Sequence, residues 1–555
     1  MNGWDVPVIV IAVSLVASWP LGAYMHRVLD PPTGRPPSTP GRLLRRLLGL
    51  SDLAEQKWQA YAVSLLVFNI AMFLIVFAVL TTQNVLPLNP DGKPAMEPIL
   101  AFNTAISFVT NTNLQHYSGE AALSYFSQLS LMWLQFVSAA TGLATLLAIA
   151  RALAGRPTMG NYYLDVARGT FLVLLPLATL WAVFLAASGV PMTFAGAQHV
   201  TTLEGAEQII ARGPVAGFMA IKQLGTNGGG FFGPNAAHPF ENPTYWTNVA
   251  NSIAIILLPM ASVWMFGRIA QRMSHAAVVF AVMLVMYVGM ILSATAFESA
   301  PTAALADLPV QQSPNLEGKE LRFGLAAAPL WAATTTATSN GSVNSMLDSY
   351  NPLAGLVAMI GLWLNVAFGG VGVGMVNMFV FIVVAVFLAG MMVGRTPEYL
   401  ARKIETPEMR LALLTLLVHP VLILGGIALF ASNEWGQATV LNPGSHGLSE
   451  IIYEFSSSAA NNGSGFEGLG DNTAPWNIAT GLSMFFARYL PILMPLAIAA
   501  SLGRKKATSE GPGTFRTDSW MFAFVLLGTV LIIGALLFLP LAVLGPIAEH
   551  LSLGG

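Results

Sequence analysis

Long apolar runs separated by polar connections dominate the sequence. A membrane-spanning helix needs about 20 largely apolar residues, and ten stretches meet that requirement. They lie near residues 6–26, 60–81, 125–153, 170–189, 245–267, 276–297, 353–394, 411–431, 475–501 and 519–544. The pattern predicts an all-α polytopic membrane protein with ten transmembrane helices. The first run follows Asp5 and lacks a basic flank, which favours a retained span over a cleavable signal.

The lysines and arginines predict the orientation of these spans. With the N-terminus outside, the inner loops carry 19 of the 25 lysine and arginine residues. Cytoplasmic loops are enriched in these two residues, and the opposite orientation would reverse the bias. The sequence therefore predicts that both termini are extracytoplasmic.

Four outer loops are longer than most inner loops. They cover residues 82–124, 190–244, 298–352 and 432–474. Each contains a modestly apolar run, in chain order Leu100–Val109, Pro214–Leu224, Leu325–Ala337 and Ser449–Ala459. Runs of about ten residues are too short to cross a bilayer and suit re-entrant half-helices.

A short polar segment follows each half-helix. The four segments are Thr110-Asn111-Thr112-Asn113, Thr226-Asn227-Gly228-Gly229, Ser339-Asn340-Gly341-Ser342 and Asn461-Asn462-Gly463-Ser464. Their first residues lie 116, 113 and 122 positions apart. Irregular backbone at membrane depth is tolerated where protein buries it or where it lines a wet cavity. Any one segment could simply cap an outer helix end, but the near-constant period favours a repeated unit.

The predicted unit is a span, a half-helix, a polar segment and a second span. Four such repeats cover residues 60–169, 170–275, 276–410 and 411–518, and the third contains a glycine-broken helix. Residues 1–59 add an extra first transmembrane helix and a basic cytoplasmic loop, and residues 519–555 add an extra last helix.

Composition excludes several other classes of protein. Only 9% of the residues are charged and 55% are hydrophobic, whereas soluble proteins have about 25% charged residues. The absence of cysteine excludes disulfides, thiolate metal sites and a cysteine nucleophile. No long basic run is present that would bind nucleic acid.

The four segments offer neutral oxygen atoms from backbone carbonyls, hydroxyls and asparagine side chains. Rings of such oxygens can replace the hydration shell of K⁺, whereas Ca²⁺ and Mg²⁺ favour carboxylates. Half-helices that end in the membrane leave carbonyls unsatisfied, with a partial negative charge at that end. The chemistry favours a monovalent cation, K⁺ ahead of Na⁺.

These segments resemble the potassium-binding A subunit of the bacterial Kdp complex, a high-affinity potassium-transporting P-type ATPase. The resemblance covers the whole chain and includes Gly225–Phe232 and His238–Pro243. It implies a potassium-channel-like pseudo-fourfold fold in the bacterial plasma (inner) membrane. It also implies K⁺ uptake from outside and transfer through an intramembrane tunnel to an ATP-hydrolysing B subunit, in a complex with a C subunit and a small F peptide. The implied ion-binding residues are the sixteen of the four segments together with Gln115.

Thr112 stands where the other segments have Gly228, Gly341 and Gly463, if the four are matched by their first residues. This matching makes exact ring symmetry doubtful, because threonine lacks the backbone freedom of glycine. We expect Thr112 to offer its hydroxyl instead.

The seventh apolar stretch is too long for one straight helix. Its 42 residues would reach about 63 Å, twice the hydrocarbon thickness. The sequence predicts a break at Gly369, Gly370, Gly372 and Gly374. One alternative is close helix packing through small residues. The other is a loop below the filter, to which the resemblance assigns gating.

Two basic residues are expected near the filter. Arg488 lies deep in a span, where a charge is a candidate for function. It could bond carbonyls of the broken helix, or its charge could discourage K⁺ from leaving to the cytoplasm. Lys222 precedes the second segment, and we expect it to pair with Glu241.

The chain is not expected to hydrolyse ATP or to bind a nucleotide. It has neither a Gly-x4-Gly-Lys-Ser/Thr phosphate loop nor the Asp-Lys-Thr-Gly phosphorylation sequence of P-type ATPases. A partner must therefore supply the catalysis of an ATP-driven pump. The alternative is a stand-alone, channel-like K⁺ or Na⁺ transporter of the same superfamily.

Overall fold

The computed structural model describes residues 4–31, 41–43, 46, 49, 54–302, 314–392, 394, 396–507 and 515–553. Ten helices of this part of the chain are long and apolar enough to cross a membrane, which confirms the predicted polytopic fold. Three inner-loop arginines of the predicted charge bias, Arg35, Arg45 and Arg395, lie outside the described residues.

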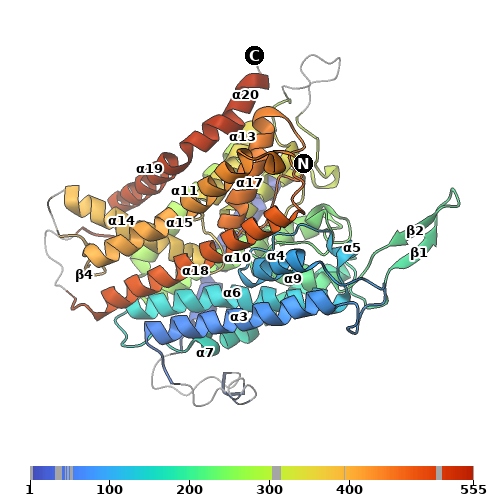
Figure 1. Cartoon of the computed structure of the whole chain (residues 1–555). Helices are drawn as coiled ribbons and strands as arrows, with labels where there is room; N and C mark the ends of the chain where they lie inside the picture. The colour runs from blue at the N-terminus through green and yellow to red at the C-terminus, as the bar shows by residue number, and fades with distance from the viewer. Residues whose placement is uncertain are drawn as a thin grey trace.

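The ten spanning elements alternate with loops along the chain (Figure 1). They are α1 (Asp5–Leu29), α3 (Trp58–Thr82), α6 (Tyr125–Leu153), α7–η1–α8 (Tyr162–Arg168, Gly169–Leu174, Leu175–Ala187), α10 (Tyr245–Ile269), α11 (Met273–Glu298), α14 (Val373–Met392), α15 (Thr406–Ala431), α18 (Ala474–Arg504) and α19–η6–α20 (Trp520–Ala542, Val543–Ile547, Ala548–Leu553).

Four shorter helices occupy the predicted half-helix positions. They are α4 (Pro98–Val109), α9 (Val215–Leu224), α12 (Ala327–Ala337) and α17 (Gly444–Ala459). The fourth begins five residues before its predicted start. Polar contacts hold this extra turn, because His446 pairs with Asp348 and Glu549.

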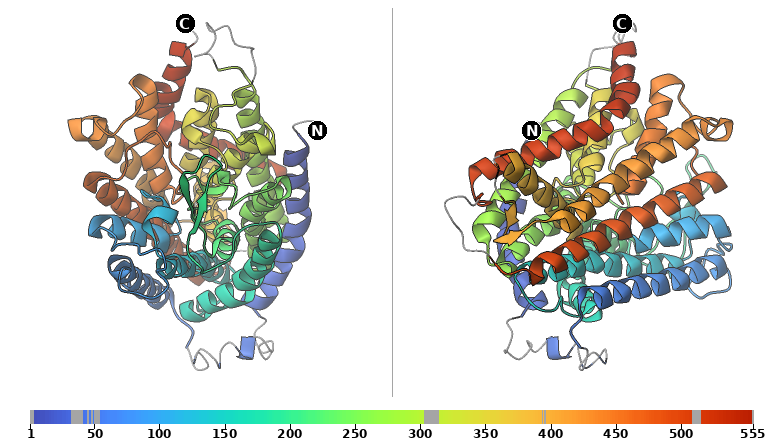
Figure 2. Two further views of the ribbon diagram at one scale, coloured as in Figure 1. Left: turned by 90° about the vertical axis from the view of Figure 1, so that its right-hand side faces the viewer. Right: turned by 60° about the vertical axis from the view of Figure 1, so that its left-hand side comes forward.

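The second helix of each repeat lies inside the first. The buried share of the most apolar window is 100%, 83%, 72% and 61% for α6, α10, α14 and α18. It is 22%, 28%, 50% and 28% for α3, α7–α8, α11 and α15. In the left view of Figure 2, the chain colours run around a central axis from blue through green and yellow to orange. The four repeats therefore surround one axis, although their residue limits stay a prediction.

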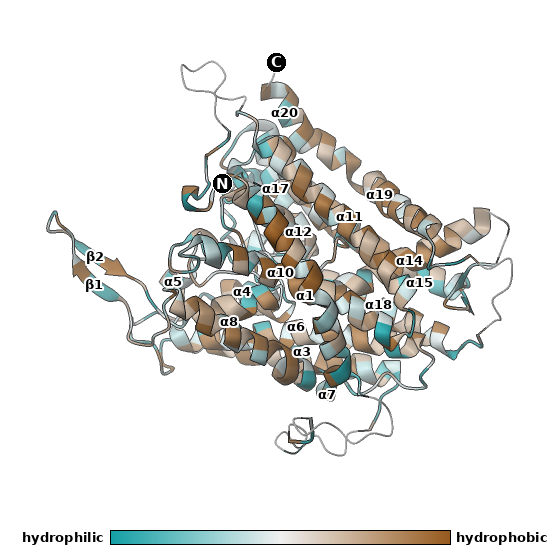
Figure 3. Cartoon of the chain, turned by 180° about the vertical axis from the view of Figure 1, so that it is seen from behind, coloured by the Kyte–Doolittle hydropathy of each residue, from teal (hydrophilic) through white to brown (hydrophobic). Residues whose placement is uncertain are grey.

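The two extra helices pack outside the repeats. Helix α1 lies along α10, and α19 packs against α11, α13 (Pro352–Leu364) and α14. Apolar residues cover much of the outward helical surface (Figure 3). An apolar belt of this kind fits a lipid-facing protein.

Short elements decorate the loops. A hairpin of β1 (Gln198–Thr201) and β2 (Glu207–Ile210), which the sequence analysis did not predict, projects from one end of the bundle (Figure 1). The others are β3 (Glu398–Tyr399), β4 (Arg402–Lys403), α5 (Gly119–Ala122), α16 (Glu434–Gln437), η2 (Asn235–Ala237), η4 (Leu321–Phe323) and η5 (Leu347–Ser349).

The fourth span begins at Tyr162, eight residues before its predicted start. The added residues include Asp165. Its carboxylate is neutralised by Arg151 of α6, with 2.5 Å between Nη1 and Oδ2. Arg151 also binds Asp30 at 2.9 Å, so one buried guanidinium joins three segments.

The seventh apolar stretch breaks as predicted, although the break begins earlier. Helix α13 ends at Leu364, and α14 begins at Val373. Asn365 takes a left-handed backbone conformation, with φ 48°. Gly374, predicted to belong to the break, lies in the first turn of α14.

We predict that Arg151→Met strongly destabilises the fold. Removing one partner of a buried ion pair leaves uncompensated charge and costs about 3–5 kcal/mol. The melting temperature of the purified Arg151→Met chain should fall well below that of Arg516→Met. Arg516 also forms an ion pair, with Asp518, but its side chain is exposed. Equal melting temperatures of the two variants would contradict this role.

Candidate functional site

The four polar segments share one backbone conformation. In each segment one capping residue follows the half-helix, and the residue after it has a positive φ; these residues are Asn111, Thr226, Ser339 and Asn461. The backbone N–H of the following residue then donates at 2.9 Å to the carbonyl five residues earlier. The four donors are Thr112, Asn227, Asn340 and Asn462. A second positive φ follows, at Asn113, Gly228, Gly341 and Gly463.

This pattern corrects the predicted place of Thr112. Its structural counterparts are Asn227, Asn340 and Asn462, so the first segment is shifted by one residue relative to the expected matching. Asn113, with φ 57°, occupies the position that is glycine elsewhere. Asparagine visits left-handed conformations more readily than most residues, so the first repeat keeps the shared backbone without glycine.

Side-chain hydrogen bonds join neighbouring repeats. Asn111 Nδ2 donates to Thr226 O at 2.9 Å, and Asn340 Nδ2 donates to Lys222 O at 3.0 Å. Asn462 Nδ2 donates to the carbonyl oxygen of Thr335 at 2.9 Å.

One further contact closes the circle. Asn461 Nδ2 donates to Thr112 Oγ1 at 2.9 Å, which connects the fourth repeat to the first. The predicted segments therefore form one closed ring. Gln115 adds a second link between repeats one and two, since its side chain bonds both N and O of Gly230.

Glycine is required at three of the four positions where neighbouring segments touch. A Cβ at Gly228 would lie 2.0 Å from Asn340 O, and one at Gly341 would lie 2.0 Å from Asn462 O. A Cβ at Gly463 would lie 2.1 Å from Thr112 O. Real Cβ atoms do not approach oxygen so closely, so these glycines set the diameter of the ring.

The oxygens available to a cation agree only in part with the expectation. In the described chain no hydrogen bond reaches the last helical carbonyls Val109 O, Leu224 O and Ala459 O, but N–H groups of the segments cap earlier carbonyls, as Thr112 N caps Ser107 O. By contrast, among the described residues no hydrogen bond reaches four equivalent carbonyl oxygens of the ring, those of Thr112, Asn227, Asn340 and Asn462. Free carbonyl oxygens of this kind are suitable ligands for a weakly hydrated cation.

Two segments also fix polar groups at the outer side of the ring. Ser342 N bonds Asn340 Oδ1 at 2.9 Å, and Ser464 Oγ lies 2.8 Å from the Tyr453 hydroxyl. At the opposite end of the first segment, Thr110 Oγ1 and Thr112 Oγ1 are 2.8 Å apart. These contacts hold the segments in place and add no charge.

The expected pairing of Lys222 is confirmed. Its Nζ lies 2.5 Å from Glu241 Oε2 and 2.5 Å from Asn235 Oδ1, and both charged side chains are fully buried. Glu241 Oε1 also accepts from Phe232 N. The pair therefore neutralises the lysine and anchors the chain that follows Gly229.

The loop between α13 and α14 is hydrogen-bonded to three of the four repeats. Val371 N donates to Thr226 Oγ1 at 2.9 Å, and Gly369 N donates to Ala337 O at 2.8 Å. Asn365 links the other two segments, because it accepts from Ser339 Oγ and donates to Ala460 O.

The same loop packs against an inner helix. A Cβ at Gly372 would lie 2.4 Å from Gly142 O of α6, so the two backbones touch. Phe368 takes φ 79°, an uncommon value for a residue other than glycine.

A small cavity of about 20 Å³ adjoins the ring at this loop, with space for about one water molecule. Its lining combines ring and loop residues with α15 and α18, namely Asn111, Ser339, Asn365, Gly370, Val373, Asn377, His419, Ala460, Asn461, Ala487, Arg488 and Pro491.

Arg488 is the charged group of this cavity. Its Nη2 donates to Ser138 O of α6 at 3.2 Å, so it does not bond the broken helix. Within the described chain no carboxylate lies within ion-pair distance of it. The cavity therefore carries an uncompensated positive charge beneath neutral oxygens.

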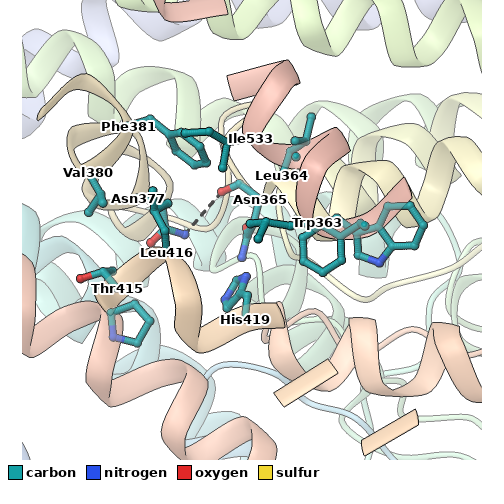
Figure 4. Close-up of a pocket in the computed structure, with 14 residues that line it drawn as sticks. Trp363, Leu364, Asn365, Asn377, Val380, Phe381, Thr415, Leu416, His419 and Ile533 are labelled. Atoms are coloured by element: carbon teal, nitrogen blue, oxygen red, sulfur yellow. Dashed lines mark hydrogen bonds between the residues drawn. The ribbon is translucent and has the colours of Figure 1, made fainter. Parts of the chain in front are cut away.

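A second cavity continues sideways toward α19 (Figure 4). The two cavities share Asn365, Asn377, His419 and Pro491. Asn377 Nδ2 contacts Asn365 O at 3.4 Å, while apolar residues such as Phe381 and Ile533 line the rest.

Sequence reasoning missed His419 and Asn377 as lining residues. A histidine within an apolar span is itself a signal, since ionisable groups in membranes mark functional positions. Ser138 and Gln135 of α6 were also missed, although both bond ring residues. Isolated polar residues in a long inner helix give no indication of which segment they face.

Comparison with known proteins identifies the family. The model of the potassium-transporting ATPase A subunit family matches residues 8–551. The chain belongs to this family. The potassium-transporting ATPase potassium-binding subunit of Pseudomonas aeruginosa is 49% identical over 100% of both chains. The protein of the same description from Caldanaerobacter subterraneus is 46% identical over 98% of both.

A solved structure supports the fold. The potassium transporter TrkH from Vibrio parahaemolyticus superposes with a TM-score of 0.52, covering 90% of this chain and 98% of its own. Its sequence identity of 13% limits the likeness to the fold. This member of the potassium-transporting ATPase A subunit family therefore has a fold similar to that of TrkH.

We predict that Gly341→Ala distorts the ring. The Cβ would collide with Asn462 O, and a positive φ of 80° costs alanine about 1–2 kcal/mol before that collision. The melting temperature of the purified chain should fall by several degrees. Gly528→Ala is the matched control, since a Cβ there meets nothing within 4 Å. An unchanged melting temperature for Gly341→Ala would show that the ring tolerates the added atom.

Proposed function

We propose that this chain binds extracytoplasmic K⁺ in the ring of four segments and delivers it to a partner ATPase. The observation that carries the proposal is the closed ring itself, with four equivalent carbonyl oxygens that accept no hydrogen bond from the described residues. The relatives are named potassium-binding subunits. Thr110–Asn113, Gln115, Thr226–Gly229, Ser339–Ser342 and Asn461–Ser464 are the proposed filter.

The chemistry of the ring supports K⁺ over divalent cations. All oxygens in the segments are neutral, whereas Ca²⁺ and Mg²⁺ sites use carboxylates. Repeated glycines hold the backbones at a fixed separation. A fixed ring of neutral dipoles favours a large monovalent ion, whose hydration shell is cheaper to remove than that of Na⁺.

The proposed route turns sideways beneath the ring. The loop with Gly369, Gly370 and Gly372 would lie across the direct path, and Gly374 lies in the first turn of the helix that follows it. Arg488 repels a cation from the same region because no carboxylate neutralises it in the described chain. The second cavity shares Asn377 with the first and extends toward α19, which supports an intramembrane tunnel in that direction.

The energy source is proposed to be a partner. The A subunit would act with an ATP-hydrolysing B subunit, a C subunit and a small F peptide, and would bind no nucleotide itself. The chain would lie in the bacterial inner membrane with both termini extracytoplasmic, in agreement with its lysine and arginine distribution.

A stand-alone K⁺ or Na⁺ transporter is the second candidate, which the fold of TrkH favours. Purification of the chain with its native partners, followed by ATPase measurement, separates the two. We expect K⁺-stimulated ATP hydrolysis. K⁺ uptake by the chain alone in liposomes, without an ATPase partner, would support the second candidate and overturn the first.

We expect Gly228→Asp to weaken K⁺ binding. The substitution places bulk and a carboxylate where a Cβ would already lie 2.0 Å from Asn340 O. The K⁺ concentration for half-maximal ATPase stimulation should rise at least tenfold, or about 1.4 kcal/mol, with reduced discrimination between Rb⁺ and K⁺. Gly205→Asp is the control, because Gly205 also has a positive φ but stands in open space. Unchanged affinity and unchanged discrimination in Gly228→Asp would refute the assignment.

Arg488→Gln should open a leak toward the cytoplasm. Loss of the buried charge removes electrostatic repulsion of about 1 kcal/mol or more, so passive K⁺ flux through the assembled complex should rise at least fivefold. Arg516→Gln is the control, because it removes the charge of an exposed arginine and should leave the passive K⁺ flux unchanged. If leak and ATP-coupled transport both stay at the wild-type level, Arg488 has no part in blocking this path.

A further inference from the structure

A cluster of ionisable side chains lies at the seam between the first and fourth repeats. His116 comes three residues after the first segment, Glu454 belongs to α17, and Asp471 follows the fourth segment. His116 Nε2 lies 3.2 Å from Glu454 Oε1 and 3.8 Å from Asp471 Oδ2. All three ligand-type atoms fall within 4.8 Å of one another.

The other ring nitrogen of His116 is fixed by an amide. Asn477 Nδ2 donates to Asn472 Oδ1 at 3.2 Å, which orients Asn477 Oδ1 toward His116 Nδ1 at 2.9 Å. Nδ1 must therefore carry the hydrogen. In the neutral imidazole the lone pair then lies on Nε2, facing the two carboxylates. Histidines that bind metals through one nitrogen are commonly oriented by such a bond from the other.

Glu454 offers an additional free oxygen. Its side chain is 2% exposed, and within the described residues its Oε2 makes no hydrogen bond. This oxygen is not among the fully buried side-chain atoms that lack a partner, so it keeps some accessible surface. It is therefore available to a cation held among the three side chains.

We propose that His116, Glu454 and Asp471 form a binding site for a divalent transition metal ion, with Zn²⁺ as the best match. Imidazole and carboxylate ligands suit Zn²⁺. Bonds of about 2.1 Å in a tetrahedral site place ligand atoms about 3.4 Å apart, close to the observed 3.2 and 3.8 Å. A water molecule completes the fourth position.

The ion can reach this site from the side of the loops. His116 and Glu454 are buried, but the side chain of Asp471 is 29% exposed and forms the entrance. Two carboxylates balance the charge of one divalent ion. The metal ion would tie the loop after the first segment to α17 and so reinforce the contact that closes the ring.

Zn²⁺ binding to the purified full-length chain, without a polyhistidine tag, tests the site directly. Calorimetry with Zn²⁺ alone should give one tight site per chain. His116→Gln should weaken this site at least tenfold, and Asp471→Asn should weaken it at least fivefold.

His199→Gln is the matched control. His199 also contacts a glutamate, Glu207 at 2.7 Å, but on an exposed hairpin without a second carboxylate ligand in the described chain. It should leave the tight site intact. If His116→Gln fails to fold, Asp471→Asn alone decides, since Asp471 is partly exposed. Equal Zn²⁺ affinity in wild type and Asp471→Asn, or no tight binding to wild type, would overturn the proposal.

Discussion

Closure of four short segments into one ring is the constraint on which the rest of the structure depends. Each segment leaves its half-helix with the same hydrogen bond, from the second residue after the cap to a carbonyl five residues earlier. Asparagine side chains then bond the neighbouring repeat, and Asn461 completes the circle at Thr112. The surrounding helices hold these segments at membrane depth, where irregular backbone must be enclosed by protein.

The four repeats have diverged where each has a separate role. The second carries the buried pair of Lys222 and Glu241, which anchors the chain behind its segment. The third has its inner helix broken into α13 and α14, and the intervening loop bonds the ring. The fourth supplies Arg488 to the cavity under the ring. Pseudo-symmetry thus builds the ring, whereas the departures from it shape the chain around and beneath the ring.

The spans, the half-helices and the four segments could be predicted from sequence, because hydrophobic length and internal repetition are local signals. The register of the first segment could not. Matching the segments by their first residues aligned Thr112 with glycines, whereas the backbone aligns it with asparagines, since Asn113 adopts the left-handed conformation. The early start of α7 also escaped prediction. Asp165 is tolerated there only because Arg151 approaches from another helix, a contact that no local pattern reveals.

The most direct test of the ring is a structure of the assembled complex with Rb⁺ or Tl⁺ in place of K⁺. Anomalous scattering identifies the heavier ion without reference to its ligands. We predict a cation on the axis of the ring, coordinated by carbonyl oxygens of Thr112, Asn227, Asn340 and Asn462. Ion density confined to the cavity beside Arg488, with none in the ring, would contradict the central claim.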